Sequence, residues 1–239
     1  MTVLAPADTP PGAAEAPQTL PETLPQPLPL SGLLRDGSRA EHEDAESSTF
    51  MSALLSGKVN AAGYACYLSM LREVYAALES VARDLADDPI ASAVIDPDLD
   101  RLGAIEADLA FWAPSGVASV HSPAVEAYVA RIHASASWGG LYVAHHYTRY
   151  LGDLSGGQMI AKRVKRQHGF ERAGAAFYDF TELGDIAEFK QRYRAVLDEL
   201  GESLDELERQ RMIDEVRAAY RFNTEVFIDM QKSNEAAAV

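Results

Sequence analysis

Four polar side chains near residue 40 include a histidine, a possible metal ligand, and have the spacing of one helical face. Steps of four, three and four residues separate Arg35, Arg39, His42 and Glu46, so the four share one face if the segment is helical. A histidine that binds a metal through one ring nitrogen needs a hydrogen-bond partner for the other, and Glu46 lies one turn away. Because most single histidines on helices are ordinary surface or core residues, this spacing alone leaves both interpretations open.

The two arginines indicate what kind of ligand this segment could bind. A guanidinium group forms a planar fork that binds carboxylates, and Arg35 and Arg39 precede the histidine by about two turns and one turn of helix. One imidazole for iron, combined with cationic groups for carboxylates, is the combination that heme requires. His42 and the two arginines are therefore candidates for the iron and the carboxylates of heme, beside their interpretation as ordinary surface residues.

A glycine-rich stretch inside an otherwise good helical pattern is the second candidate. The segment YTRYLGDLSGGQ contains Gly152, Gly156 and Gly157, and each glycine costs a helix up to about 1 kcal/mol relative to alanine. Close packing of another helix would explain them, and so would a large flat ligand that approaches the backbone where a Cβ atom would collide. Arg149 and Asp153 are then either an exposed pair of small energetic value or part of an interior polar network beside the ligand.

The elements that must position these residues are helices almost throughout. We see no internal repeat and no alternating strand pattern, and 116 residues without proline follow Pro123, which suits long helices. Residues 170–184 are expected to form a loop with a short extended piece. The fold class is therefore all-α, a single-domain multi-helix bundle, with helices expected at 31–46, 48–56, 61–87, 99–112, 123–135, 139–168, 186–200 and 203–232.

Start and stop signals support several of these helix ends. The expected N-terminal caps are Asn60, Ser122 before Pro123, and Ser203 with Glu206 at capping-box spacing. The expected C-terminal stops are glycines 57, 169 and 201.

Composition excludes several classes of function. The chain has 239 residues with 36 acidic and 21 basic side chains, a net charge of −15, which argues against broad nucleic-acid binding. Cys66 is the only cysteine, so there is no internal disulfide and no site built from several cysteines. No apolar run is long enough to span a membrane, and no basic residue precedes Arg35 as a signal peptide would require. We expect a cytoplasmic protein.

Three parts are expected along the chain. Residues 1–30 hold eight of the twelve prolines and are expected to be a disordered extension. Residues 31–232 form the functional domain, and residues 233–239 a flexible tail.

These motifs resemble the heme oxygenase family. YTRYLGDLSGGQ is similar to the family's distal-helix signature almost letter for letter, and EHEDAESSTFM resembles the segment that carries the proximal histidine. Further similarities follow in the family's order and bring the coverage to about residues 31–232: VYAALE (74–79), DLAFW (108–112), YVARIH (128–133), FKQRYR (189–194) and AYRFNTEVF (219–227).

The resemblance implies a site as well as a fold, with heme between a proximal helix and a kinked distal helix. It implies that His42 is the iron ligand and Glu46 its hydrogen-bond partner, and that the three glycines lie over the heme face. The implied distal water network, which has the catalytic role, consists of Asp153, Arg149, Tyr75 and Asn223. The implied heme-binding residues are Arg35, Arg39, Glu46, Gly152, Gly156, Gly157, Lys190, Tyr193, Arg194 and Phe227.

The implied activity is that of an oxidoreductase for which heme is both substrate and cofactor. The family uses O2 and electrons from a redox partner to convert heme to biliverdin, carbon monoxide and Fe2+, through a ferric hydroperoxide and meso-hydroxyheme. The basic cluster Lys162, Arg163, Lys165 and Arg166 is unusual on an acidic protein, and we expect it to dock a ferredoxin, flavodoxin or flavoprotein reductase. No coiled-coil seam is present, so a monomer is expected.

Two other functions fit part of the pattern. A protein that stores, delivers or senses heme without cleaving it would share the binding residues, but it would not need the GDLSGG motif with its aspartate. A non-heme di-iron oxidase needs inward Glu and His residues on several helices, and that set is not found. We expect histidines 121, 133, 145, 146 and 168 not to bind the metal, and Tyr142, Tyr147 and Tyr150 to be core or pocket wall.

Overall fold

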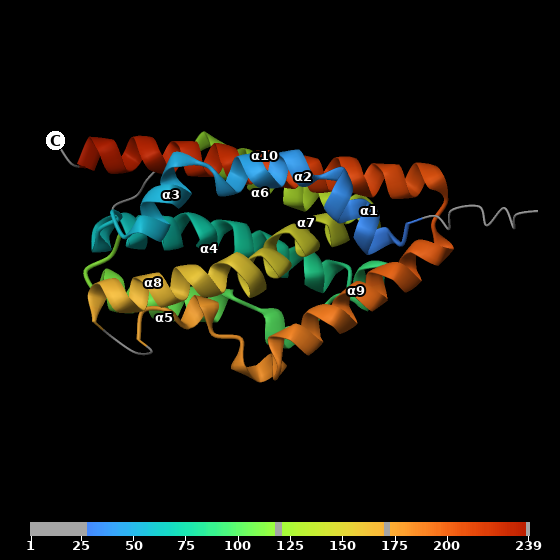
Figure 1. Ribbon diagram of the computed structural model, residues 1–239, viewed down its shortest axis with the longest axis horizontal. Helices are drawn as coiled ribbons and strands as arrows, with labels where there is room; N and C mark the ends of the chain where they lie inside the picture. Colours follow the sequence, from blue (N-terminus) through green and yellow to red (C-terminus); the bar gives the residue numbers. More distant parts are fainter. Residues whose placement is uncertain (1–27, 118–120, 170–172, 238–239) are drawn as a thin grey trace, which may run out of the picture.

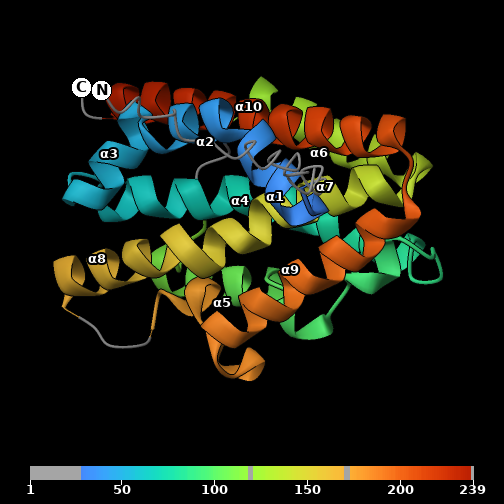
Figure 2. The same ribbon diagram turned by 45° about the vertical axis from the view of Figure 1, so that its right-hand side comes forward.

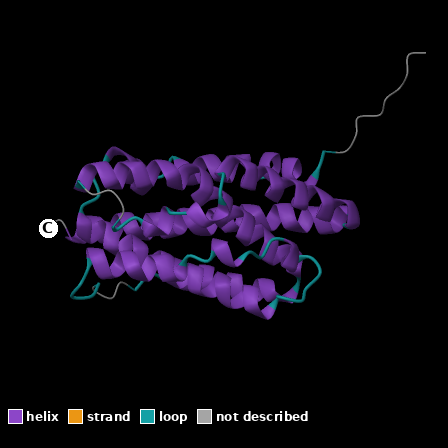
Figure 3. Ribbon diagram, turned by 90° about the horizontal axis from the view of Figure 1, so that it is seen from below, coloured by secondary structure: helices purple, strands orange, loops and turns teal. Residues whose placement is uncertain are grey.

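The computed structural model describes residues 28–117, 121–169 and 173–237, and these residues contain ten α-helices and no β-strand (Figures 1 and 3). The predicted all-α class is confirmed. A π-helical turn, η4 (Asp153–Gly157), joins α7 to α8. The helices are Leu30–Gly37 (α1), Arg39–Glu46 (α2), Thr49–Ser56 (α3), Ala61–Asp84 (α4), Leu102–Trp112 (α5), Pro123–Ala134 (α6), Gly139–Gly152 (α7), Gln158–His168 (α8), Ile186–Ser203 (α9) and Glu206–Ala237 (α10).

Two long helical rods organise the bundle. α10 runs along one side of the molecule, and α7, η4 and α8 together form a second rod that crosses below it (Figures 1 and 2). α7 packs on α10, α4 packs on α5 and α6, and α2 also lies against α10. The apolar core fills the space between these helices, with Phe50, Leu78, Val143 and Met212 each buried.

The expected helix 31–46 is wrong as a single element, because the chain breaks at Ser38. The backbone of Ser38 has φ −114° and ψ 13°, and its hydroxyl donates to the carbonyl of Leu34 at 2.7 Å. Nε of Arg217 on α10 donates to the carbonyl of Gly37 at 2.6 Å. These bonds satisfy carbonyl groups that the end of α1 leaves unpaired. Because the chain breaks at Ser38, Arg35 and Arg39 belong to different helices.

Most of the expected caps are confirmed. Asn60 accepts from the N–H of Gly63, and Ser122 accepts from the N–H of Val125. Gly57 and Gly169 end α3 and α8 in the left-handed conformation, with φ of 73° and 74°, which glycine adopts without strain.

Two expected signals near the α9–α10 junction are wrong. The capping box uses Asp205 and Glu208 in place of Ser203 and Glu206, since each side chain accepts from the other's N–H, at 2.8 and 2.9 Å. Gly201 lies inside α9 and does not end it. A Cβ atom there would be 2.7 Å from Cβ of Leu30, so the close approach of α1 explains this glycine.

The helix ends differ from the expected ones by a few residues elsewhere. α4 ends at Asp84, α5 begins at Leu102, and α10 continues to Ala237, past the expected end at 232. In place of the expected extended piece within 170–184, the described part, from 173 on, forms two 3₁₀ turns. The expected proline-rich extension lies outside the described residues up to residue 27. None of the described helices is long and apolar enough to cross a membrane.

A buried ionic cluster fixes the position of α7. Glu215 on α10 lies 2.7 Å from Nε2 of His145 on α7 and 2.7 Å from Nε of Arg131 on α6. Burial opposes the charge of Glu215, but hydrogen bonds from these two partners lower its pKa to about 2, so the carboxylate is charged at neutral pH. This cluster joins three helices, and spacing along the sequence gave no signal for it.

Candidate functional site

A cavity of about 330 Å³ lies in the bundle beside α2 and the α7–α8 rod, which is an ordinary size for a ligand pocket. We call it the central cavity. α1, α2, α3, α4, α9 and α10 also contribute to its wall. The expected site residues that line it are Arg35, His42, Glu46, Arg149, Gly152, Asp153, Gly156, Gly157, Arg194, Asn223 and Phe227.

α2 supplies the candidate ligand. Nε2 of His42 lies 3.3 Å from a carboxylate oxygen of Glu46, one turn along the helix. The His42 side chain lines the cavity and is 44% exposed. The ring also contacts the ring of Tyr220, with centroids 5.1 Å apart. His42 therefore combines an accessible imidazole with a carboxylate partner that can fix its orientation.

The three glycines at the end of α7 and in the π-helical turn have two different explanations. A Cβ atom added at Gly152 or Gly156 would meet no atom within 4 Å, and because both residues line the cavity, it would enter cavity space. A Cβ atom at Gly157 would lie 2.8 Å from Cδ1 of Tyr178. Close packing thus explains Gly157, whereas Gly152 and Gly156 leave bare backbone on which a flat ligand can lie.

A buried polar network stands directly behind this backbone. The hydroxyl of Tyr75 on α4 donates to Asp153. Nε and Nη2 of Arg149 lie 3.3 and 3.2 Å from that hydroxyl, and Nη1 donates to Oδ1 of Asn223 at 2.9 Å. Every member is less than a tenth exposed, so Arg149 and Asp153, which lie 3.7 Å apart, form an interior network and not a surface pair.

Burial sets the protonation of this network. It raises the pKa of the Asp153 carboxyl, an effect that the charge of Arg149 and the hydrogen bond from Tyr75 oppose. Burial also raises the pKa of Tyr75 well above its ordinary value, so its phenol is neutral and donates. A carboxyl group that faces a cavity and is held by a phenol and a guanidinium is suited to orient water and to transfer a proton.

The cationic edge of the cavity is smaller than expected. Arg35 and Arg194 line the wall, but Arg39 does not, and its guanidinium pairs with Asp36 at 2.8 Å. Asp36 also pairs with Arg35 at 2.9 Å. Asp36 on α1 thus pairs with one arginine on each side of the break at Ser38.

Two expected residues of α9 lie outside the cavity wall. Nζ of Lys190 donates to Oγ of Ser155 at 3.2 Å, which ties α9 to the π-helical turn. The hydroxyl of Tyr193 lies 2.8 Å from Nδ1 of His146, and burial lowers the pKa of that histidine to about 3. His146 is therefore neutral, and Tyr193 joins α9 to α7 inside the core.

The wall also contains residues for which sequence reasoning gave no role. These residues are Met51, Tyr67 and Tyr220. Tyr147 also lines the cavity, as expected. Their aromatic or flexible side chains at helical spacing are indistinguishable from core residues in the sequence. Within residues 28–117, 121–169 and 173–237 no group of three or more His, Cys, Asp or Glu side chains is arranged to hold a metal ion.

The contrast between neighbouring glycines gives a stability prediction. Gly156→Ala should raise the free energy of unfolding by up to about 1 kcal/mol, because alanine favours helix and its methyl group enters open space. Gly157→Ala should lower it by about 1–2 kcal/mol, because the methyl group displaces Tyr178. Urea unfolding of the two variants measures both, and equal shifts for both would contradict the different surroundings of the two glycines.

Comparisons with known proteins give matches over most of this chain. A family model described as heme oxygenase matches residues 28–229. Heme oxygenase 1 of the cyanobacterium Synechocystis is 35% identical over 205 residues, which cover 84% of this chain and 85% of that one. Heme oxygenase 1 of Pongo abelii is 35% identical over 209 residues, covering 85% and 72%. The crystal structure of Synechocystis heme oxygenase-2 with heme and NO is similar with a TM-score of 0.82 and 34% identity, covering 88% of each chain.

Proposed function

The chain belongs to the heme oxygenase family, and we propose that its central cavity binds heme and opens the ring to biliverdin, with release of carbon monoxide and ferrous iron. The catalytic domain then spans residues 31–232. One observation carries the proposal: a single cavity is lined by His42 with its carboxylate partner, by the bare backbone of Gly152 and Gly156, and by Asp153.

The residues present fit heme. His42 offers one imidazole, Gly152 and Gly156 offer a surface without side chains, and Arg35 and Arg194 offer guanidinium groups for carboxylates. When bound, heme supplies an iron that binds O2 and accepts electrons, and a ring whose carbon is oxidised.

The polar network assists the reaction through protons. Asp153 faces the cavity and orients a water molecule there, while Arg149 and Tyr75 hold the carboxyl group in place. Asn223 fixes the guanidinium of Arg149 from α10. The backbone at Gly152 and Gly156 would lie beside a bound ring and would limit the space there for a small ligand.

The alternative function is storage, delivery or sensing of heme without cleavage. Such a protein needs the histidine that binds iron and the cationic edge. It gains nothing from a buried polar network at the cavity that transfers protons. Four buried polar side chains from three helices and the π-helical turn are costly to desolvate, which favours the enzyme.

The test is heme titration followed by turnover. The apoprotein should bind one equivalent of heme and, in air with a ferredoxin and its reductase, should release biliverdin, identified by chromatography. Heme binding without biliverdin would support the storage, delivery or sensing function. No heme binding would refute both.

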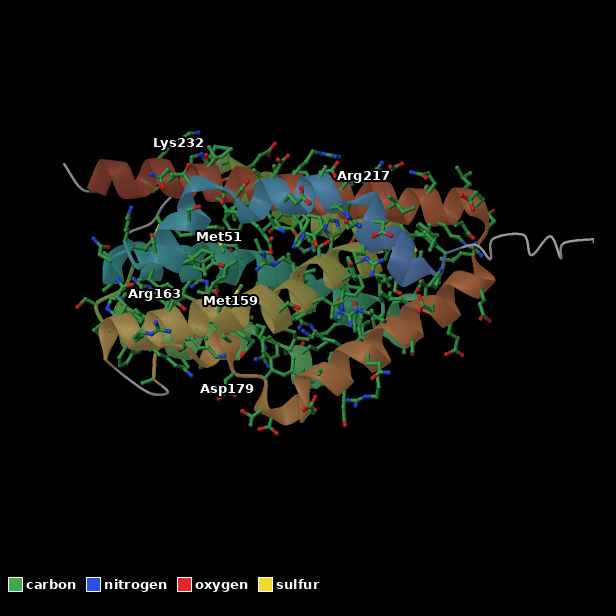
Figure 4. All side chains as sticks on the ribbon, viewed as in Figure 1. Met51, Met159, Arg163, Asp179, Arg217 and Lys232 are labelled. Carbon is green, nitrogen blue, oxygen red and sulfur yellow. The ribbon has the colours of Figure 1, made fainter. Side chains whose placement is uncertain are left out.

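We also propose that an acidic electron donor docks at the basic face of α8, in the reducing cytoplasm. Figure 4 shows Arg163 on α8, whose guanidinium donates to the carbonyl of Ser56 at the end of α3. Met159 is 58% exposed on the same helix, so apolar and basic side chains are neighbours there. Arg163 therefore has a structural role as well as a charge, and Lys162, Lys165 and Arg166 carry the remaining positive charge.

Charge reversal tests this face. Lys162→Glu, Lys165→Glu and Arg166→Glu together should slow ferredoxin-driven turnover about tenfold or more at low salt, since electrostatic steering is lost. Turnover of this variant driven by ascorbate should stay unchanged. A control variant with Arg83→Glu and Arg192→Glu, which change two arginines on other helices, should keep the ferredoxin-driven rate. A ferredoxin-driven rate that is insensitive to the triple reversal would contradict docking at α8.

A further inference from the structure

Three aromatic side chains that can be oxidised connect the central cavity to the end of α5. Tyr67 on α4 lines the cavity, and its ring centroid lies 6.2 Å from that of Tyr64. Tyr64 meets Trp112 edge-to-face at 5.1 Å. Trp112 is partly buried at the last position of α5, and its indole N–H donates to the carbonyl of Gly174 at 2.7 Å. The rings thus form a continuous series from the cavity toward the surface.

Packing alone does not explain tyrosine at the two inner positions. The Tyr64 hydroxyl is buried and has no hydrogen-bond partner among the described residues, so phenylalanine would fill the same space without leaving a polar group unsatisfied. Tyr178 donates to the Tyr67 hydroxyl at 3.5 Å, a long and therefore weak bond. A buried, unsatisfied polar group in a native protein calls for an explanation such as a redox role.

We propose that Tyr67, Tyr64 and Trp112 form an electron path that removes oxidising equivalents from the central cavity before they damage the protein. The inference rests on the proposed function, because heme and O2 or peroxide are the source of those equivalents. Tyrosine and tryptophan are the side chains that most readily lose one electron, and ring contacts at these distances allow electrons to move faster than enzymes turn over.

Each step of the path transfers one electron, and the electrons and protons balance as follows. Tyr67 gives one electron and its phenolic proton to the oxidant in the cavity. Trp112 then returns an electron to Tyr67 across the ring of Tyr64, and Tyr67 regains a proton from solvent at the cavity mouth. The indole remains one electron oxidised, with the Gly174 carbonyl stabilising its N–H, until a thiol or ascorbate supplies one electron. The net change is one electron and one proton to the oxidant.

The experiment traps the oxidised side chain. Heme-loaded protein receives one equivalent of hydrogen peroxide with a nitroso spin trap and no reductant, and peptide mass spectrometry locates the adduct. The wild type should carry the adduct on Trp112, and Tyr67→Phe should lower that adduct at least fivefold. Trp112→Phe should move the adduct inward to Tyr64 or Tyr67. Tyr142→Phe, which removes a buried phenol outside the path, is the control and should leave the Trp112 adduct unchanged.

Two outcomes would overturn the path: no adduct on Trp112 in the heme-loaded wild type, or an undiminished adduct in Tyr67→Phe. Melting curves and heme spectra of the variants show that they are folded and loaded, and Trp112→Phe gives an independent test if Tyr67→Phe loads poorly. If the wild type shows no heme spectrum at all, the proposed function fails. If it shows the spectrum and no adduct on Trp112, the path alone fails.

Discussion

Asp153→Ala should retain heme and lose ring opening, with biliverdin formation slowed about 100-fold or more. The carboxyl group of Asp153 is the one acidic group of the buried network that lines the central cavity, and removing one oriented group of this kind costs about two to three orders of magnitude in rate. Because His42, the proposed iron ligand, and the cationic edge remain, the heme spectrum and affinity should change little. Biliverdin yield per heme, measured under ascorbate or ferredoxin reduction, checks this result.

Two further variants sharpen the test of Asp153. Asp87→Ala removes an exposed carboxylate after α4 and should leave the yield unchanged. Tyr75→Phe removes the donor to Asp153 and should give an intermediate loss. In Asp153→Ala the heme ring should stay closed. We expect this heme to support peroxidase-like oxidation of added phenols. Full biliverdin yield from this variant would refute the assignment of Asp153.

His42→Ala should weaken heme binding about tenfold or more and change the heme spectrum. The imidazole of His42 is accessible at the cavity and has a carboxylate partner, so its loss removes the proposed axial ligand. Spectral titration with heme measures both effects, and added imidazole should restore the wild-type spectrum, because a free imidazole fits the space that the side chain leaves.

His121 provides a matched control for His42. It also lies beside a carboxylate, with Nδ1 3.0 Å from Glu126, but it is exposed just before α6 and does not line the central cavity. His121→Ala should therefore leave heme affinity and spectrum unchanged. A wild-type heme spectrum in His42→Ala without added imidazole would exclude His42 as the ligand.

The sequence predicted the features that depend on local spacing. His42 and Glu46 lie one turn apart on one helix, and Arg149 and Asp153 meet as expected for residues four apart. Helix caps such as Asn60 were predicted for the same reason, since a cap depends on a few adjacent residues.

Features that depend on packing between distant segments were not predictable from spacing. The end of α1 depends in part on Arg217, which comes from α10 and donates to the carbonyl of Gly37. The resemblance implied heme contact for Lys190 and Tyr193, but α9 directs both side chains to α7 and the π-helical turn. Gly157 looks like its neighbours in the sequence, and only Tyr178, which comes from a distant loop, distinguishes it.

A single-turnover experiment tests the central claim most directly. Heme-loaded protein in air receives excess ascorbate, which supplies the several electrons that each ring opening consumes, in the presence of catalase, and a carbon monoxide trap counts the gas released. Catalase removes free peroxide, so ring opening must come from O2 bound in the central cavity. We predict loss of the heme absorbance with one equivalent each of biliverdin and carbon monoxide per heme. Heme absorbance that persists after reduction, with no carbon monoxide released, would contradict the account.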